Sequence, residues 1–243
     1  METHIAARLV QLNQQFYQTF GAQFSATRQR IQPGVRRILD QTPPDANILD
    51  LGCGNGELAQ ELLKGGYHGR YLGLDFSQAL LDVAKSNTGK ESNITFARAD
   101  LADSTWDNIL PAAPFDLIFS FAVFHHLPGD RLRRNTVNKI GQRLAPNGKF
   151  IHSHWQFLSS PKLRARVQPW DVIGLSRAEV DQGDHLLDWR RGGYGLRYVH
   201  HASEDYLNSL ASGTGFQVED AFYSDGAEGN LGFYQIWGKR SGN

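Results

Sequence analysis

The chain has 243 residues, of which 40% are hydrophobic and 21% charged, a composition that suits one globular domain with an elaboration. Its 25 basic and 25 acidic residues cancel, so no overall field attracts nucleic acid or a membrane, and only local clusters could do so. A single cysteine, Cys53, excludes an intrachain disulfide. Without a signal peptide or a long apolar run, we expect a cytoplasmic protein that makes no membrane contact.

The first predicted element is an amphipathic helix at the N-terminus. Its apolar residues recur at spacings of three and four: Ile5, Leu9, Leu12, Phe16 and Phe20. This spacing predicts a helix that ends near Gly21. A polar stretch follows it, and Pro43-Pro44 marks the approach to the main domain. We therefore interpret residues 1–42 as a helical cover of a single domain that spans residues 1–243.

Strands and helices then alternate along the chain. Apolar segments predict strands at 47–53, 71–76, 94–100, 115–121 and 149–155. Helices follow Gly56, Ser77 and Asp130, and the last two residues are expected to cap them. This alternation predicts a Rossmann-like α/β fold with a parallel sheet covered on both faces.

The C-terminal part departs from this alternation. A helix is expected at 204–213, and strands at 216–223 and 231–237 are joined by a turn-rich segment. They predict a hairpin that completes a mostly parallel seven-stranded sheet with an antiparallel edge. Residues 156–202 fit neither pattern, and we interpret them as an insertion over the active-site edge, where loops commonly carry specificity.

A glycine-rich loop follows the first predicted strand. The segment reads Ile48-Leu49-Asp50-Leu51-Gly52-Cys53-Gly54-Asn55-Gly56. Glycines allow a tight turn and a close approach of ligand to backbone. A dinucleotide site favours G-x-G-x-x-G, but Glu57 stands where the third glycine would be, and the Asp50 carboxylate would repel pyrophosphate. A dinucleotide fold with an altered loop is the alternative, whereas a ligand with an ammonium and a sulfonium group suits the acid.

The loop resembles the first motif of class I methyltransferases that use S-adenosylmethionine. Later motifs follow in order, with Asp75 ending the second strand and Asp100 ending the third. The resemblance implies that Asp75 binds the ribose hydroxyls and that Asp100 lies near the adenine amino group. The cofactor-binding residues that we predict are Asp50, Gly52, Gly54, Gly56, Asp75, Phe76, Asp100, Leu101 and Ser120.

The flanking segments resemble a narrower family, the eukaryotic-type tRNA wobble-uridine carboxymethyl methyltransferases. The matching segments are 24–28, 122–126, 184–189, 197–200 and Gly229-Asn230. The resemblance implies a methyl ester formed on a carboxymethyl group of a tRNA uridine, and a small activator protein as partner. Four substrate-side residues depart from the pattern of this family: Gln32, Asp188, Val199 and Ala202.

The chemistry of ester formation needs few groups. A carboxylate acceptor is already anionic at neutral pH, so the protein mainly has to hold it in line with the methyl group. An arginine fork suits that role, and Arg28 and Arg197 are the candidates, although either could instead be structural. His125 and His126 follow the fourth strand, at the edge where such folds bind ligands, and one of them could orient the acceptor.

Other site types remain as alternatives. His152 and His154 share one face of the fifth strand and could bind a metal with His125 or His126, but no acidic or cysteine partner stands out, and we expect no metal. The glycine loop is also compatible with a methyltransferase for a small metabolite, with the insertion as a lid. It is compatible, too, with a protein that binds S-adenosylmethionine without turnover.

Overall fold

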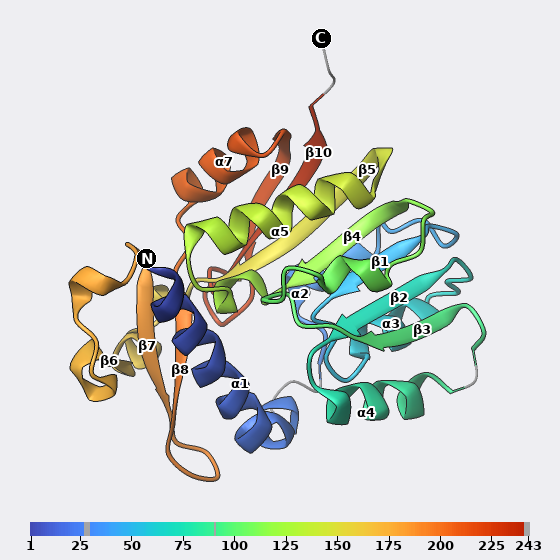
Figure 1. The fold of residues 1–243 in the computed structure, drawn as a ribbon. Coiled ribbons are helices and arrows are strands. Elements are labelled where there is room, and N and C mark those ends of the chain that lie inside the picture. Colours follow the sequence, from blue (N-terminus) through green and yellow to red (C-terminus); the bar gives the residue numbers. More distant parts are fainter. Residues whose placement is uncertain (27–29, 90, 241–243) are drawn as a thin grey trace.

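The computed structural model describes residues 1–26, 30–89 and 91–240. Its centre is a seven-stranded sheet in the order β3-β2-β1-β4-β5-β10-β9 (Figure 1). The strands are β1 (Ile48–Leu51), β2 (Tyr71–Asp75), β3 (Ile94–Arg98), β4 (Phe115–Phe121), β5 (Leu144–Trp155), β9 (Phe216–Ser224) and β10 (Gly232–Lys239). The first five pair in parallel, and β10 runs antiparallel to both β5 and β9. The predicted fold class and the C-terminal hairpin are confirmed.

Helices cover both faces of this sheet. They are α2 (Pro33–Leu39), α3 (Glu57–Lys64), α4 (Gln78–Thr88), α5 (Asp130–Arg143) and α7 (Glu204–Gly213). Ser77 caps α4 by accepting a hydrogen bond from the Leu80 N–H, as expected. Asp130 does not cap α5: Gly129 holds the N-cap position, and the Asp130 carboxylate accepts hydrogen bonds from Arg134 and Tyr206 instead.

Two apolar layers pack against the sheet, as the alternation of β1 shows. Leu49 and Leu51 belong to the layer that includes residues of α5 and α7. Ile48 belongs to the opposite layer, with residues of α2 and α3. Successive strand residues face opposite sides, so all four residues of β1, Asp50 included, are buried between the two layers.

The N-terminal helix and the insertion pack against each other. Helix α1 (Thr3–Ala26) continues beyond Gly21, so the predicted end near that residue is wrong. No atom lies within 4 Å of the position that a Cβ would take at Gly21, so packing does not require a glycine there. Residues 156–202 contain α6 (Pro161–Arg164) and a second, antiparallel sheet of β6 (Val167–Gln168), β7 (Asp184–Trp189) and β8 (Gly195–His200). Ile5 and Leu9 of α1 pack with Leu186 and Tyr198 of this sheet, and Figure 1 shows α1 lying along β7 and β8.

Of the helices in the described ranges, none is both long and apolar enough to cross a membrane.

Candidate active site

A cavity of about 460 Å³ lies where β1, β2 and β4 end and β3 leads into Asp100. One side of it holds most of the predicted cofactor residues: Asp50, Gly52, Gly54, Asp75, Phe76, Asp100 and Leu101. The other side is formed by the ends of β4 and β5, the start of β10 and the approach to α2, including Phe121, Ser153, His154, Trp155, Tyr234 and Arg30. Ala122 and Val123, which follow the central strand β4, line the cavity between the two sides.

The glycines of the loop serve different purposes. Gly52 has φ 79°, and a side chain there would collide with Val123. Gly54 has φ 55°, and no atom lies within 4 Å of the position a Cβ would take, although Gly54 lines the cavity. That open position is where a ligand can approach the backbone. Gly56 is not on the cavity wall, and a Cβ there would lie 2.8 Å from the Cβ of Ala84 in α4.

The acidic residues at the ends of β2 and β3 accept hydrogen bonds from backbone amides. Asp75 accepts hydrogen bonds from the N–H groups of Gly54 at 3.0 Å and Ser77 at 2.8 Å, which ties the loop to β2. Burial nevertheless raises its pKa. Asp100 accepts a hydrogen bond from the Ala102 N–H at 2.9 Å and a second from the Gln14 side chain at 2.6 Å. Both residues line the cavity, and their roles toward ribose and adenine stay predictions.

Asp50 is the third acid of this side. Its side chain is 4% exposed, and the Tyr71 hydroxyl donates to it at 2.6 Å. Burial raises the pKa of Asp50 from 3.8 to about 7, because one neutral hydrogen bond does not replace the lost hydration of the charged form. A cationic ligand group in the cavity would supply the missing stabilisation.

Helix α1 contributes a polar stripe that the sequence reasoning missed. Asn13, Gln14, Tyr17 and Gly21 line the cavity at helical spacing. The Tyr17 hydroxyl lies 2.7 Å from Nε2 of His126. Asn13 donates to the Tyr198 carbonyl at 3.1 Å and accepts from the Tyr198 N–H at 2.8 Å, which joins α1 to β8. The available signal was a second stripe, beside the apolar one, at the same period.

The structure separates the candidate catalytic residues. His126 lines the cavity, whereas His125 is buried behind it, with its ring 6.2 Å from that of Trp155. Arg197 is buried too and is not on the cavity wall; its guanidinium lies 4.9 Å from the ring of Trp155 and 5.4 Å from that of Phe16. Arg28 lies outside the described residues.

Ser120 is also set back from the cavity. It is fully buried in β4 and does not line the wall, unlike Phe76 and Leu101. The next strand places His152 and His154 side by side, with Nδ1 of the first 3.0 Å from Nε2 of the second. Burial holds the pKa of both imidazoles far down, that of His152 at about 3. Across the parts of the chain that the structure describes, no three His, Cys, Asp or Glu side chains are placed to hold a metal ion.

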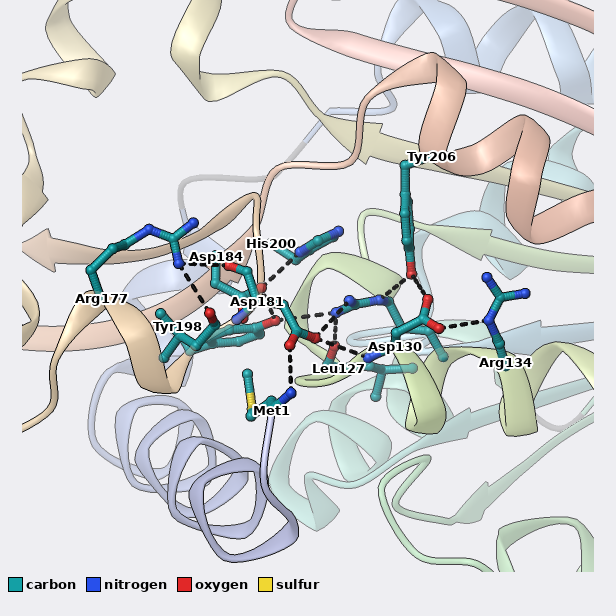
Figure 2. A network of polar contacts seen from close by, with 12 residues as sticks. Met1, Leu127, Asp130, Arg134, Arg177, Asp181, Asp184, Tyr198, His200 and Tyr206 are labelled. Carbon is teal, nitrogen blue, oxygen red and sulfur yellow. Dashed lines mark hydrogen bonds and ion pairs between the residues drawn. The ribbon is translucent and has the colours of Figure 1, made fainter.

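A buried arginine fastens the second sheet to the main domain. The Arg133 guanidinium donates to the Leu127 carbonyl at 2.9 Å, to the Tyr198 hydroxyl at 3.2 Å and to the Tyr206 hydroxyl at 2.6 Å. Tyr198 in turn donates to Asp184 at 2.7 Å (Figure 2). Since this network joins α5, α7, β8 and the Leu127 carbonyl next to His126, it fixes β8 beside the loop that holds His126.

Comparison with known proteins agrees with this geometry. A glycine loop before α3 and acids after β2 and β3, on this strand order, define a class I methyltransferase fold that binds S-adenosylmethionine. Residues 48–148 match the family described as methyltransferase domain, and this is the stretch that holds the loop and both acids. The protein is an S-adenosylmethionine-dependent methyltransferase.

Three relatives show which kinds of named methyltransferase resemble this chain. A methyltransferase-named protein of Encephalitozoon cuniculi is 28% identical over 84% of this chain and 87% of its own length. A malonyl-[acyl-carrier protein] O-methyltransferase of Halalkalibacterium halodurans is 32% identical over 48% of this chain and 44% of its own length. The Bos taurus protein named probable tRNA methyltransferase 9B is 28% identical over 63% and 31%. The chain thus spans less than half the length of the last two.

Solved structures share the fold at low identity. A methyltransferase of Methanosarcina mazei superposes with a TM-score of 0.63 at 20% identity, covering 86% of this chain and 98% of that one. The N-methyltransferase NodS of Bradyrhizobium japonicum, in complex with S-adenosyl-L-homocysteine, gives 0.59 at 16% identity, covering 88% and 91%.

Proposed function

We propose that the protein forms a methyl ester on the carboxymethyl group of a wobble uridine in tRNA. The cofactor supplies an electrophilic methyl group on its sulfonium. A carboxylate attacks it without a general base, so the protein has only to bind and orient the acceptor. His154 lies on the acceptor side, where burial keeps its pKa well below the usual range. It is therefore a poor proton acceptor, which fits a reaction that needs no general base.

The observation that carries the proposal is the composition of the acceptor side. Among the described residues that line the cavity, Arg30 is the only arginine or lysine. Arg30 comes two residues after Arg28, the arginine in the segment that resembles the wobble-uridine family. The Arg30 guanidinium would pair with an acceptor carboxylate. Tyr17, Phe121 and Trp155 add aromatic surface on which a pyrimidine ring could stack. Relatives named probable tRNA methyltransferase 9B, in Bos taurus and Homo sapiens, add support from sequence.

The test is a methyl-transfer assay with labelled S-adenosylmethionine. Its acceptors are an anticodon stem-loop RNA with carboxymethyluridine at the wobble position and the same RNA with uridine, each with and without a small activator protein of the kind the resemblance implies. We expect label only on the carboxymethyl RNA and its release by mild alkali, which hydrolyses esters. Arg30→Gln should raise the KM for RNA and leave cofactor affinity unchanged. Label on uridine RNA, or alkali-stable label, would contradict the proposal.

A second candidate is O-methylation of a small metabolite. It is favoured by Asp225, a carboxylate on the acceptor side that accepts hydrogen bonds from the Gly34 N–H at 2.9 Å and the Tyr234 hydroxyl at 2.6 Å. Such a group could take the proton of a hydroxyl acceptor. Relatives named ubiquinone biosynthesis O-methyltransferase cover about half of this chain. Label transferred to a metabolite extract and to neither RNA would select this alternative.

A further inference from the structure

The turn between β7 and β8 carries basic and aromatic side chains and contacts the C-terminal part of α1, the helix that lines the cavity. This hairpin tip comprises Arg190, Arg191, Gly192, Gly193 and Tyr194. We propose that the hairpin tip is a docking surface for the phosphodiester backbone of a single-stranded RNA loop, with Arg191 contacting phosphate and Tyr194 stacking on a base. The inference deepens the proposed function and rests on it for the identity of the RNA.

Contacts within the turn and with α1 brace the hairpin tip. The indole N–H of Trp189 donates to the Arg191 carbonyl at 2.6 Å at the start of the turn. Gly193, with φ 140°, lies against Phe20 of α1, and a Cβ there would come within 3.1 Å of that ring. Arg190 donates twice to the buried Asp188, at 2.9 and 2.6 Å. A preorganised surface loses little conformational entropy on binding.

Helix α1 connects the hairpin tip to the cavity that would receive the target base. Phe20, which Gly193 contacts, directly precedes Gly21, and Gly21 lines the cavity together with Tyr17 one turn earlier. Figure 1 shows the turn of β7 and β8 at the same end of the molecule as the C-terminal end of α1. A nucleotide in the cavity would therefore bring its neighbours in the strand towards the hairpin tip.

Beyond the Arg190–Asp188 pair, the positive charge near the hairpin tip has no acidic partner within the described ranges. The segments 155–170 and 189–199 contain no aspartate or glutamate. Asp188 lies between them, but it is buried and its carboxylate already pairs with Arg190. Arg191 and Arg166 form no ion pair within the described ranges. Arg166 is adjacent, because its carbonyl accepts the Asp188 N–H at 3.0 Å.

The aromatic residue points to a nucleic acid loop as the partner. Tyr194 is 60% exposed, the largest exposure among the large apolar side chains that the structure describes as exposed. Single-stranded RNA loops display unstacked bases that stack on aromatic rings, and their phosphates bind cations such as Arg191 in the same turn. The chain as a whole has no net charge, so this local excess would orient the RNA rather than attract polyanions over the entire surface.

The experiment measures binding of the labelled carboxymethyluridine stem-loop RNA to the full chain by fluorescence anisotropy, between low and moderate salt and without turnover. Arg191→Glu should weaken binding at least about fivefold and reduce the salt slope by about one. Tyr194→Ala should weaken binding to a similar degree, with the salt slope unchanged. The matched control is Arg131→Glu, an exposed arginine on α5, which should bind RNA like the wild type. Affinity for S-adenosyl-L-homocysteine and the melting temperature should not change in any variant.

The possible outcomes test the docking surface separately from the proposed function. Equal losses in Arg191→Glu and Arg131→Glu, or wild-type binding by both hairpin variants, overturn the docking surface, as does a wild type that binds phosphatidylserine vesicles but not RNA. If the wild type binds the stem-loop through the hairpin tip but does not methylate it, the surface stands and the proposed function fails. If it methylates the RNA and the hairpin variants keep the wild-type KM, the proposed function stands and the surface fails.

Discussion

Asp50 should make cofactor binding depend on pH. Its carboxyl lies buried against the glycine loop, and its pKa is raised from 3.8 to about 7. A cationic group bound in the cavity would stabilise the carboxylate, so binding should release the proton that Asp50 carries below pH 7. With a folded-state pKa near 7 and a much lower one in the complex, affinity should rise about tenfold from pH 6 to pH 8.

The assay is titration calorimetry with S-adenosyl-L-homocysteine across this pH range, in two buffers of different ionisation enthalpy. Asp50→Asn is the comparison variant, because its amide oxygen can still accept the Tyr71 hydroxyl. The ratio of wild-type to variant affinity cancels the titration of the ligand itself. That ratio should rise with pH, and only the wild type should show proton release. A ratio independent of pH would refute the reasoning.

The same pKa shift has a consequence for stability. Because the folded-state pKa of Asp50 lies above its unfolded value, the fold favours the protonated carboxyl, and stability is lost as pH rises from about 4 to 7. The full shift corresponds to about 4 kcal/mol as an upper limit. Without ligand, Asp50→Asn should therefore gain stability relative to the wild type between pH 5 and pH 8 in urea unfolding. If the free energy of unfolding varied with pH in the same way for both proteins, the raised pKa of Asp50 would be contradicted.

Three further predictions concern the loop, the ribose acid and α1. Gly54→Val should abolish binding of S-adenosyl-L-homocysteine, since its side chain would enter the cavity, and should lower the melting temperature, since φ 55° strains a β-branched residue; a folded variant with wild-type affinity would show that the loop does not hold the cofactor. Asp75→Ala should weaken that binding by about 10- to 100-fold, the contribution of one charge-assisted hydrogen bond or two, and calorimetry with unchanged affinity would exclude the ribose role. Asn13→Ala removes the buried hydrogen bonds between α1 and β8 and should lower the free energy of unfolding by about 1–3 kcal/mol. Its control is the exposed Gln15→Ala, and equal losses in urea unfolding would mean that Asn13 contributes nothing specific.

The sequence by itself determined the fold class and the order of the cofactor motifs. Hydrophobic runs bounded by caps and glycines reveal strands and helices because burial imposes a local period. The alternation of these elements then leaves few topologies for a sheet. The acids at positions 75 and 100 could be assigned to the cavity because each follows a parallel strand, and such strand ends meet at one edge.

Only the tertiary structure decided which side chains share the cavity. A helical period shows that α1 buries one stripe, but not that Gln14 reaches Asp100 or that Tyr17 reaches His126, since those contacts join residues 86 and 109 positions apart. The insertion forms its own three-stranded sheet through antiparallel pairing that no local sequence pattern predicted. Arg197 illustrates the same limit: its place in β8 sets it behind Trp155, among aromatic rings, because strand register and packing fix where a side chain points.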